Sequence, residues 1–384
     1  MQSLKSEIYS ACCNSSRNKL IPILKRDQCS TWANVLKQAE TTVGYSTSFL
    51  NLRWLLSDEI ANLASSVNKI LGTNHPILKT ARNILVKSDV PSWGLIILLV
   101  SKASSINTKF LEGKDRTSGI LHTQRMIAEI VETLKTGIYF HKSLQLKQEL
   151  KQLPSEMNQG NKIALLVGDY LITKSYKILA EINNSEVEEI ISSALRDLCE
   201  EEFFGERNDE DNCQPSARYS PDDASFNVDV YSFEPHQHKS YLCKPKAEWA
   251  MRNCLAGAFL LGKGCYAAVK LGERPINLQN SSFTFGVNLA LACQARKDLN
   301  TFENQSTIPL EKVAAPVLFH LEQHPDLGWK NIDDDTLRQE ISAGVGVRKT
   351  EKMLSEFLMK ADMSLEQFPR SEARDSLRKM LEII

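Results

Sequence analysis

The stretch MIAEIVETLKTGIYFHKSLQL at residues 126–146 indicates how this chain folds. Its apolar side chains recur at spacings of three and four residues, at Ile127, Ile130, Val131, Leu134 and Ile138. That period places them on one face of an amphipathic α-helix. Helical periods of this kind continue along the chain from about residue 50 onward, and no stretch shows the sustained alternation of a half-buried strand. The sequence therefore predicts an all-α fold.

Length and composition set the class of protein. The chain has 384 residues, of which 42% are hydrophobic, and this is enough for one large core or two ordinary ones. The formal net charge of −1 gives no overall attraction to nucleic acid or to an anionic membrane. The longest apolar run, residues 94–100, is far shorter than the roughly 20 residues that span a bilayer. Nine scattered cysteines form no Cys-x-x-Cys pair. We expect a soluble protein with no transmembrane span, whose thiols are reduced as in an intracellular compartment.

Two segments depart from the helical pattern. The first 26 residues hold five basic residues, one acid and several serines, a composition shared by mitochondrial transit peptides and by ordinary disordered tails. Both readings stay open for residues 1–35, and residues 36–384 are expected to form the helical domain. Within that domain, residues at about 200–244 begin EEEFFGERNDED and then lose helical periodicity. We expect a flexible insertion there, with a binding element as the alternative.

Three stretches carry a family resemblance: VGYSTSFLNLRWLLSDEIANLA at 43–64, GNKIALLVGDYL at 160–171 and FPRSEARDSLRKMLE at 368–382. Through them the chain resembles the trans-prenyl diphosphate synthase family over roughly residues 40–384. It is most similar to the degenerate second subunit of the decaprenyl diphosphate synthase that makes the ubiquinone side chain in animal mitochondria. The resemblance implies an isoprenoid synthase-type helical bundle with a central cavity, and a body that dimerises through helices near the first metal motif.

In that family, two Asp-Asp-x-x-Asp motifs hold the magnesium ions that ionise an allylic diphosphate. Magnesium prefers oxygen ligands in octahedral geometry, and lysines at these positions oppose its binding. We therefore expect no metal and no catalytic residue on this chain. The residues at the two motifs are His141, Lys142, Ser143 and Leu146 at the first, and Lys297, Asp298 and Thr301 at the second.

Other family contacts with diphosphate are also absent. The segment KSDVPSW at 87–93 stands where the family has Gly-Lys-x-x-Arg-Pro, and KQELKQLPSE at 147–156 stands where Arg-Arg-Gly is expected. The family's Lys-Thr pair falls on Ala256 and Gly257. The resemblance thus implies that the helical framework persists while the groups that bind metal and diphosphate are lost.

The single residues also have plain structural readings. We expect Asp298 to be a surface or helix-capping aspartate, because one carboxylate does not hold a magnesium cluster. His141 is expected to be packed or solvated. Gly168, in the stretch shared across the family, is expected to permit close helix packing. Lys142 and Lys297 remain candidates for residual contacts with a diphosphate.

The resemblance implies a non-catalytic subunit, inactive alone, of a heteromeric all-trans polyprenyl diphosphate synthase. Its partner would be a catalytic subunit that carries Mg²⁺ and takes farnesyl or geranylgeranyl diphosphate together with isopentenyl diphosphate. We expect this complex in the mitochondrial matrix, with at most peripheral contact with the inner membrane. Two alternatives stay open: a divergent prenyl or terpene synthase with substitute ligands, for which Glu129 and Glu132 are the available carboxylates, and a prenyl-diphosphate carrier that uses Lys142 and Lys297.

Overall fold

The computed structural model describes residues 34–44, 92–104, 119–144, 155–208, 212–216, 218–219, 238–302, 310–324, 334–342 and 344–384. Most of the N-terminal segment 1–35 and the centre of the 200–244 insertion lie outside these residues. A helix at residues 34–43 opens the described chain. The α-helices that follow are α6 (Trp93–Ala103), α8 (His122–His141), α9 (Ser155–Ile182), α10 (Ser185–Glu200), α11 (Pro245–Asn253), α12 (Phe259–Leu271), α13 (Ile276–Asn300), α14 (Ala315–Gln323), α15 (Asp334–Ser342), α16 (Val345–Leu365) and α17 (Glu372–Ile383).

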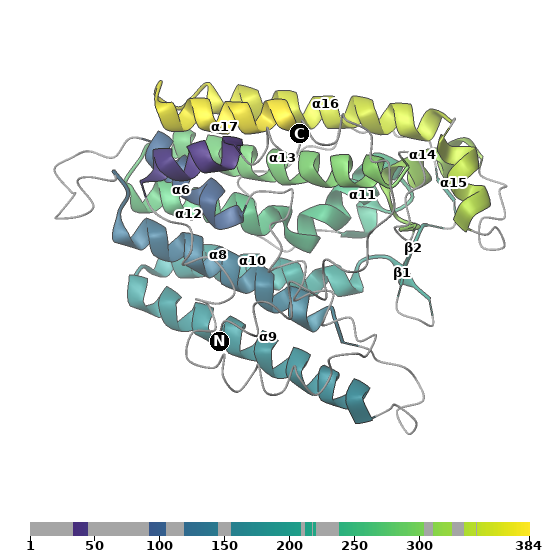
Figure 1. The fold of residues 1–384 in the computed structure, drawn as a ribbon, viewed down its shortest axis with the longest axis horizontal. Coiled ribbons are helices and arrows are strands. Elements are labelled where there is room, and N and C mark those ends of the chain that lie inside the picture. Colours follow the sequence, from purple (N-terminus) through teal and green to yellow (C-terminus); the bar gives the residue numbers. More distant parts are fainter. Residues whose placement is uncertain are drawn as a thin grey trace, which may run out of the picture.

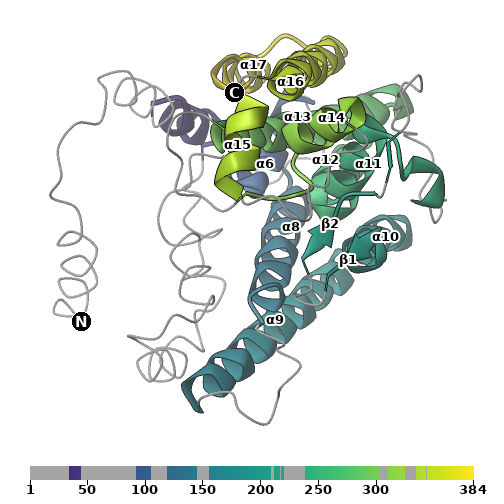
Figure 2. The same ribbon diagram turned by 90° about the vertical axis from the view of Figure 1, so that its right-hand side faces the viewer.

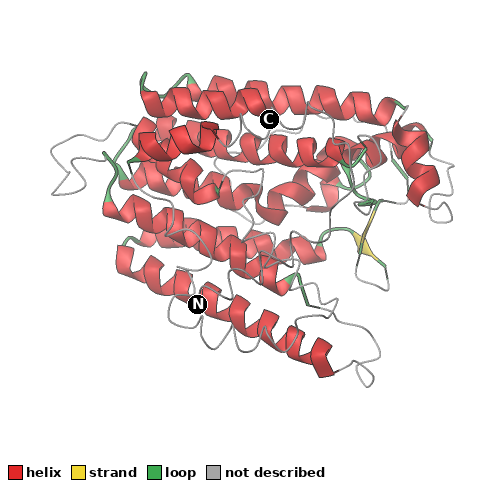
Figure 3. Ribbon diagram, in the orientation of Figure 1, coloured by secondary structure: helices red, strands yellow, loops and turns green. Residues whose placement is uncertain are grey.

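Shorter elements complete the described chain. They are the 3-10 helices η3 (Glu201–Phe203) and η4 (His238–Tyr241), the π-helical turn η5 (Cys254–Ala258), and a two-residue antiparallel pair, β1 (Glu206–Arg207) and β2 (Cys213–Gln214). Helices dominate the described residues (Figure 3). The predicted all-α fold is confirmed.

The helices form a layered bundle around α12. α16 and α17 cover one side, α13 and α6 lie beneath them, and α8, α10 and α9 follow on the other side (Figure 1). The 90° view places α9 at the edge opposite α16 and α17 (Figure 2). α12 contacts α13, α6, α8 and α10, so it has neighbours all round. A helix in that position must be apolar on every face, as its buried side chains are.

Glycines bring α12 and α13 close together. A Cβ built at Gly286 of α13 would lie 2.9 Å from the Cα of Gly262 in α12, and one built at Gly262 would lie 2.5 Å from the Val287 side chain. The helices cross here at a distance that no other residue allows without a shift. Sequence periodicity finds the apolar faces of both helices but not this contact.

A buried ion pair also fixes α12. Lys263 Nζ lies 2.5 Å from Asp197 Oδ2 of α10, and each side chain is 1% exposed. Burial lowers the pKa of Lys263, and the charge of Asp197 acts in the opposite direction. Asp197 also has the guanidinium of Arg196 at 3.4 Å, but that side chain is 35% exposed. Removing one partner of the buried pair is therefore destabilising, because the other charge stays buried with little compensation.

One continuous helical span, Pro245–Leu271, is the only helix among the described residues that is long and apolar enough to cross a membrane. Within the bundle, 83% of its apolar window is buried by other parts of the chain. Packing against the neighbouring helices accounts for its apolar composition, as in the core of a soluble protein.

Both described ends of the insertion contact the bundle through Glu248 of α11. Ser216 Oγ donates to its Oε2 at 2.6 Å, Tyr219 OH donates to its Oε1 at 3.2 Å, and the backbone N–H of Cys243 donates at 3.1 Å. Burial raises the pKa of the Tyr219 phenol, with the charge of Glu248 as the second cause. The described ends of the insertion are therefore packed parts of the bundle.

Candidate functional site

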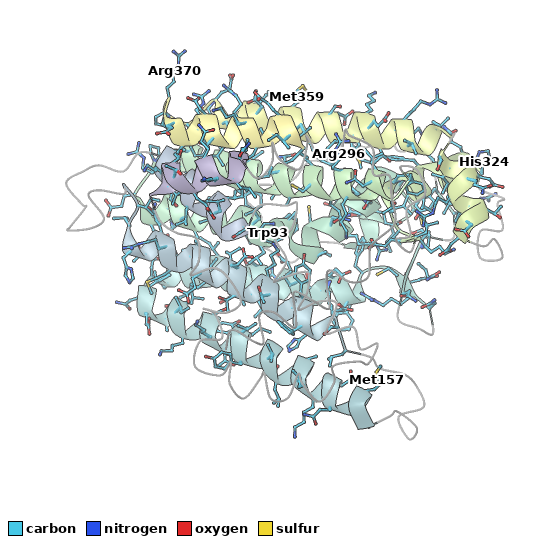
Figure 4. The ribbon with its side chains drawn as sticks, in the orientation of Figure 1. Trp93, Met157, Arg296, His324, Met359 and Arg370 are labelled. Atoms are coloured by element: carbon cyan, nitrogen blue, oxygen red, sulfur yellow. The ribbon has the colours of Figure 1, made fainter. Side chains whose placement is uncertain are left out.

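A cavity of about 320 Å³ lies where α8 and α13 end. Lys142 lines it from α8, and Lys297 and Asp298 line it from α13. The structure thus brings residues from both of the expected motif positions to one place. Trp93, at the start of α6 (Figure 4), also lines this cavity. His141 and Ser143 are absent from the lining, and Leu146 lies outside the described residues.

The first motif lies at the end of α8. The apolar spacing in 126–146 predicts a helix through this stretch, whereas α8 ends at His141 with Lys142 as its C-cap, and Leu146 lies outside the described residues. Ser143 is buried, and its Oγ donates to the carbonyl of Phe140 at 2.6 Å, which closes the last turn.

Lys142 is bound to carboxylates of this chain. Its Nζ lies 2.7 Å from Glu201 Oε2 and 3.9 Å from Glu202 Oε1, both in η3. Arg207 of β1 reaches the same two carboxylates at 3.6 Å and 2.8 Å. The Glu201 side chain is 7% exposed, so water screens this interaction only in part. Sequence reasoning missed Glu201, since its acidic run was interpreted only as the start of the insertion.

His141 points toward α9 and not into the cavity. Its Nε2 lies 3.1 Å from Asp169 Oδ1 and 3.3 Å from the carbonyl oxygen of Leu165. A Cβ built on Gly168 would lie 2.1 Å from the His141 ring. Gly168 therefore leaves the space that this ring occupies, in line with the expectation of close packing.

Asp298 is a buried capping residue. Its Oδ2 accepts hydrogen bonds from Trp249 Nε1 at 2.8 Å and from the backbone N–H of Ala315 at 2.9 Å, and its Oδ1 accepts one from Gln294 Nε2 at 2.8 Å. Ala315 begins α14, so this carboxylate satisfies a helix N-terminal donor. Burial raises the pKa of Asp298 to about 6, and the two bonds from Ala315 and Trp249 oppose that shift.

Lys297 and Thr301, the other residues of the second motif, take different positions. Lys297 is 61% exposed, and its Nζ lies 3.7 Å from Glu311 Oε1 in the segment that leads into α14. Thr301 is the C-cap of α13, and its hydroxyl donates to the Asp298 carbonyl at 2.6 Å. Each of the two expected motif positions therefore presents one lysine to the cavity, and each lysine faces a carboxylate of this chain.

The position expected for the family's Lys-Thr pair is a π-helical turn against an indole. Gly257 has a φ of +156°, and a Cβ there would lie 2.6 Å from the Trp93 ring. Lys135 Nζ lies 4.3 Å from the centroid of that ring, a cation–π contact. Ala256 and Gly257 thus offer no side-chain donor, and Trp93 lies where glycine leaves room.

The residues of the cavity do not suit a divalent metal cluster. The described part of the chain contains no group of three or more His, Cys, Asp or Glu side chains that could hold a metal ion. Both oxygens of Asp298 already accept hydrogen bonds, and both lysines place positive charge at the motif positions. The cavity lining holds three basic residues, Lys142, Lys297 and Arg252, and three acidic ones, Glu201, Glu311 and Asp298.

The alternative carboxylates on α8 also have structural partners. Glu129 Oε1 lies 3.3 Å from Lys174 Nζ of α9, and burial raises the pKa of Glu129. Glu132 Oε2 accepts from Ser92 Oγ and from the backbone N–H of Gly94, both at 3.1 Å, at the start of α6. These two residues hold helices together and line no part of the cavity.

Comparison with known proteins gives the family. No family model matches the chain. The chain is 33% identical over 371 residues to the Homo sapiens protein named all trans-polyprenyl-diphosphate synthase PDSS2, with 91% of this chain and 86% of that protein covered. It is 25% identical over 419 residues to a probable mitochondrial hexaprenyl pyrophosphate synthase of Yarrowia lipolytica, with coverages of 91% and 87%.

Solved structures agree in fold. The geranylgeranyl pyrophosphate synthase of Bacteroides thetaiotaomicron has a TM-score of 0.58 at 14% identity, with 91% of this chain and 98% of that one covered. The decaprenyl diphosphate synthase of Rhodobacter capsulatus has a TM-score of 0.56 at 16% identity, with coverages of 86% and 96%. These two structural matches show that the helical fold is shared, and the relative at 33% identity shows the family. The chain belongs to the trans-prenyl diphosphate synthase family.

Proposed function

We propose that this chain is the non-catalytic subunit of a heteromeric all-trans polyprenyl diphosphate synthase. One observation carries the proposal: the cavity is retained, but the lysines at both motif positions are paired with the chain's own carboxylates. Magnesium and catalysis are assigned to a partner subunit with intact aspartate motifs. The relative named PDSS2 supports a polyprenyl diphosphate synthase subunit.

Relatives named as mitochondrial hexaprenyl pyrophosphate synthases support a mitochondrial location. Their names describe the synthesis of long polyprenyl diphosphates, and we place the chain in the making of the ubiquinone side chain on the resemblance given above. A position in the matrix, with peripheral contact with the inner membrane, is part of the proposal.

The outer face of α9 is the proposed contact with the partner. Leu165, Leu166, Tyr170 and Tyr176 on this helix are 36% to 56% exposed. Leu166 and Tyr170 are four residues apart, so they share one face. α9 packs chiefly against α8 and lies at an edge of the bundle (Figure 2). Apolar groups gathered at such an edge are typical of a protein interface.

Co-expression tests the proposal. The chain is produced with the aspartate-intact polyprenyl synthase of the same organism, and size exclusion is followed by a magnesium-dependent prenyl transfer assay. We expect a stable mixed complex that makes long-chain product and a lone chain that makes none. Turnover by the purified lone chain would refute the non-catalytic role, and separate elution of the two chains would refute the heteromer.

A surface variant locates the contact. Leu166→Glu with Tyr170→Glu places two charges on the α9 face, and we expect the mixed complex to dissociate because desolvating unpaired charge at an interface is unfavourable. The matched control is Met359→Glu with Met363→Glu, an exposed pair at the same spacing on α16, across the bundle (Figures 1 and 4). If both variants bind the partner as the wild type does, α9 is not the interface.

The divergent-enzyme alternative relies on Glu129 and Glu132, and both bind structural partners away from the cavity. The carboxylates that do line the cavity already have partners: Glu201 and Glu311 pair with lysines, and Asp298 accepts hydrogen bonds. The carrier alternative keeps its two lysines in the cavity, but both already face carboxylates. The proposal of a non-catalytic subunit requires neither catalytic carboxylates nor diphosphate-binding lysines on this chain.

A further inference from the structure

The cavity contains opposite charges supplied by separate parts of the chain. Lys142 is the C-cap of α8 and Lys297 lies in the last turn of α13. The carbonyl ends of helices carry partial negative charge, so these positions favour cations. Glu201 comes from η3, after α10, and Glu311 comes from the segment before α14. Each of the two lysines therefore lies at the carbonyl end of a helix and faces a carboxylate from another segment.

We propose that two carboxylates of this same chain, Glu201 and Glu311, neutralise Lys142 and Lys297 and so prevent anionic diphosphates from binding in the cavity. These two side chains are named the internal carboxylates. In a metal-dependent site, divalent cations bridge protein carboxylates and the anionic ligand. In this cavity the ammonium groups of Lys142 and Lys297 occupy the role of the metal cations. The internal carboxylates occupy the role of the anionic ligand. The inference rests on the proposed function in one respect, that the cavity is a degenerate diphosphate site.

The two pairs differ in strength. The Lys142–Glu201 distance is 2.7 Å between side chains that are 34% and 7% exposed, so solvent screens this pair only in part. The Lys297–Glu311 distance is 3.7 Å between side chains that are 61% and 58% exposed, so water and salt weaken it strongly. Glu201 is therefore the main barrier to an anion, and Glu311 adds to it.

Arg207 adds to the difference between the two lysine–carboxylate pairs. It contacts both Glu201 and Glu202, so the Lys142 carboxylates are held from two sides. Arg252, the third basic residue of the cavity, donates to the Phe204 carbonyl at 3.0 Å and pairs with Glu248 at 3.5 Å. Each basic residue of the cavity lining thus has an acceptor within the described part of the chain.

The test uses the full chain, with inorganic diphosphate as the probe, in the presence of a chelator, by isothermal titration calorimetry. We expect the wild type to bind weakly or not at all, and Glu201→Gln with Glu311→Gln to bind at least about tenfold more tightly, because two like charges no longer oppose the ligand. Glu201→Gln alone should give most of the gain. Adding Lys142→Met to the double variant should remove most of it.

The control is Glu322→Gln with Glu356→Gln. It makes the same change in net charge by neutralising the partners of Lys349 and Lys246, which lie outside the cavity lining. Equal gains in the control and the cavity variant would overturn the inference, as would wild-type binding as tight as that of the double variant. Should Glu201→Gln fail to fold, Glu311→Gln alone decides: a gain over a matched Glu322→Gln supports the inference, and none overturns it.

Failure of this test is distinct from failure of the proposed function. Co-elution with the catalytic partner and magnesium-dependent product are measured separately on the same wild-type chain. A mixed, active complex, together with no gain in diphosphate binding by the Glu201→Gln and Glu311→Gln variants, would refute the exclusion of diphosphate and leave the proposed function standing.

Discussion

Replacing Asp298 by asparagine separates a structural carboxylate from a metal ligand. The folded-state pKa of this group is raised by burial from its ordinary 3.8 to about 6. A raised pKa in an acid means that the folded state binds the proton more tightly than the unfolded state does. Stability from this group is therefore present below about pH 4 and is lost as the pH rises through about 6.

The difference of about two pKa units corresponds to about 3 kcal/mol at neutral pH, at 1.36 kcal/mol per unit. About half of that loss falls between about pH 5 and about pH 8, because the unfolded state is already largely ionised at the lower value. Asparagine cannot ionise, so Asp298→Asn should lose this dependence and be as stable as the wild type or more stable at the higher pH.

Asparagine also fits the contacts. Its carbonyl oxygen can accept from Trp249 Nε1 and the Ala315 N–H, which now share one carboxylate oxygen. Rotation of the Gln294 amide would let its oxygen accept from the new NH₂ group. Asp298→Ala is the matched comparison. It leaves two buried donors without an acceptor, and we expect it to be about 2–4 kcal/mol less stable than the asparagine variant.

The assay is denaturant unfolding followed by circular dichroism at about pH 5 and about pH 8 for the three proteins. If the unfolding free energy of the wild type depended on pH no more than that of Asp298→Asn, the raised pKa of Asp298 would be refuted. In the mixed complex, Asp298→Asn should leave magnesium-dependent product formation unchanged. Loss of activity with stability intact would instead make Asp298 a ligand.

Two further predictions concern the core. Lys263→Met leaves the buried Asp197 with only the partly exposed Arg196 as a cationic partner among the described residues. We expect a loss of about 3–5 kcal/mol in denaturant unfolding, largely recovered when Asp197→Leu is added; equal losses in both variants would contradict the pairing. Gly286→Ala places a methyl group 2.9 Å from the Gly262 Cα, so we expect about 1–3 kcal/mol of overpacking cost, against little change for Ser281→Ala on a less buried face of the same helix; an unchanged midpoint in Gly286→Ala would show that α12 and α13 can separate freely.

The helical class and the apolar faces follow from the sequence by itself, and the absence of the family's aspartates is what the resemblance implies. Each is a local property, because a spacing of three and four residues defines a face and a motif is a matter of residue identity at neighbouring positions. The spacing around Ile127 and Leu134 predicted α8 correctly in its body. The described helix ends at His141 and is followed by turn residues, and periodicity does not mark that end.

Tertiary structure alone decided what replaced the lost chemistry. Glu201 stands 59 residues from Lys142 and appeared in the sequence only as part of an acidic run. Asp298 could be identified as a capping residue, but its helix begins at Ala315, beyond a loop, and its indole donor comes from Trp249 on α11. Such contacts between distant segments depend on how buried helices pack, and no local pattern records that. The sequence determined which groups are missing, and the packing determined which groups neutralise the charges left behind.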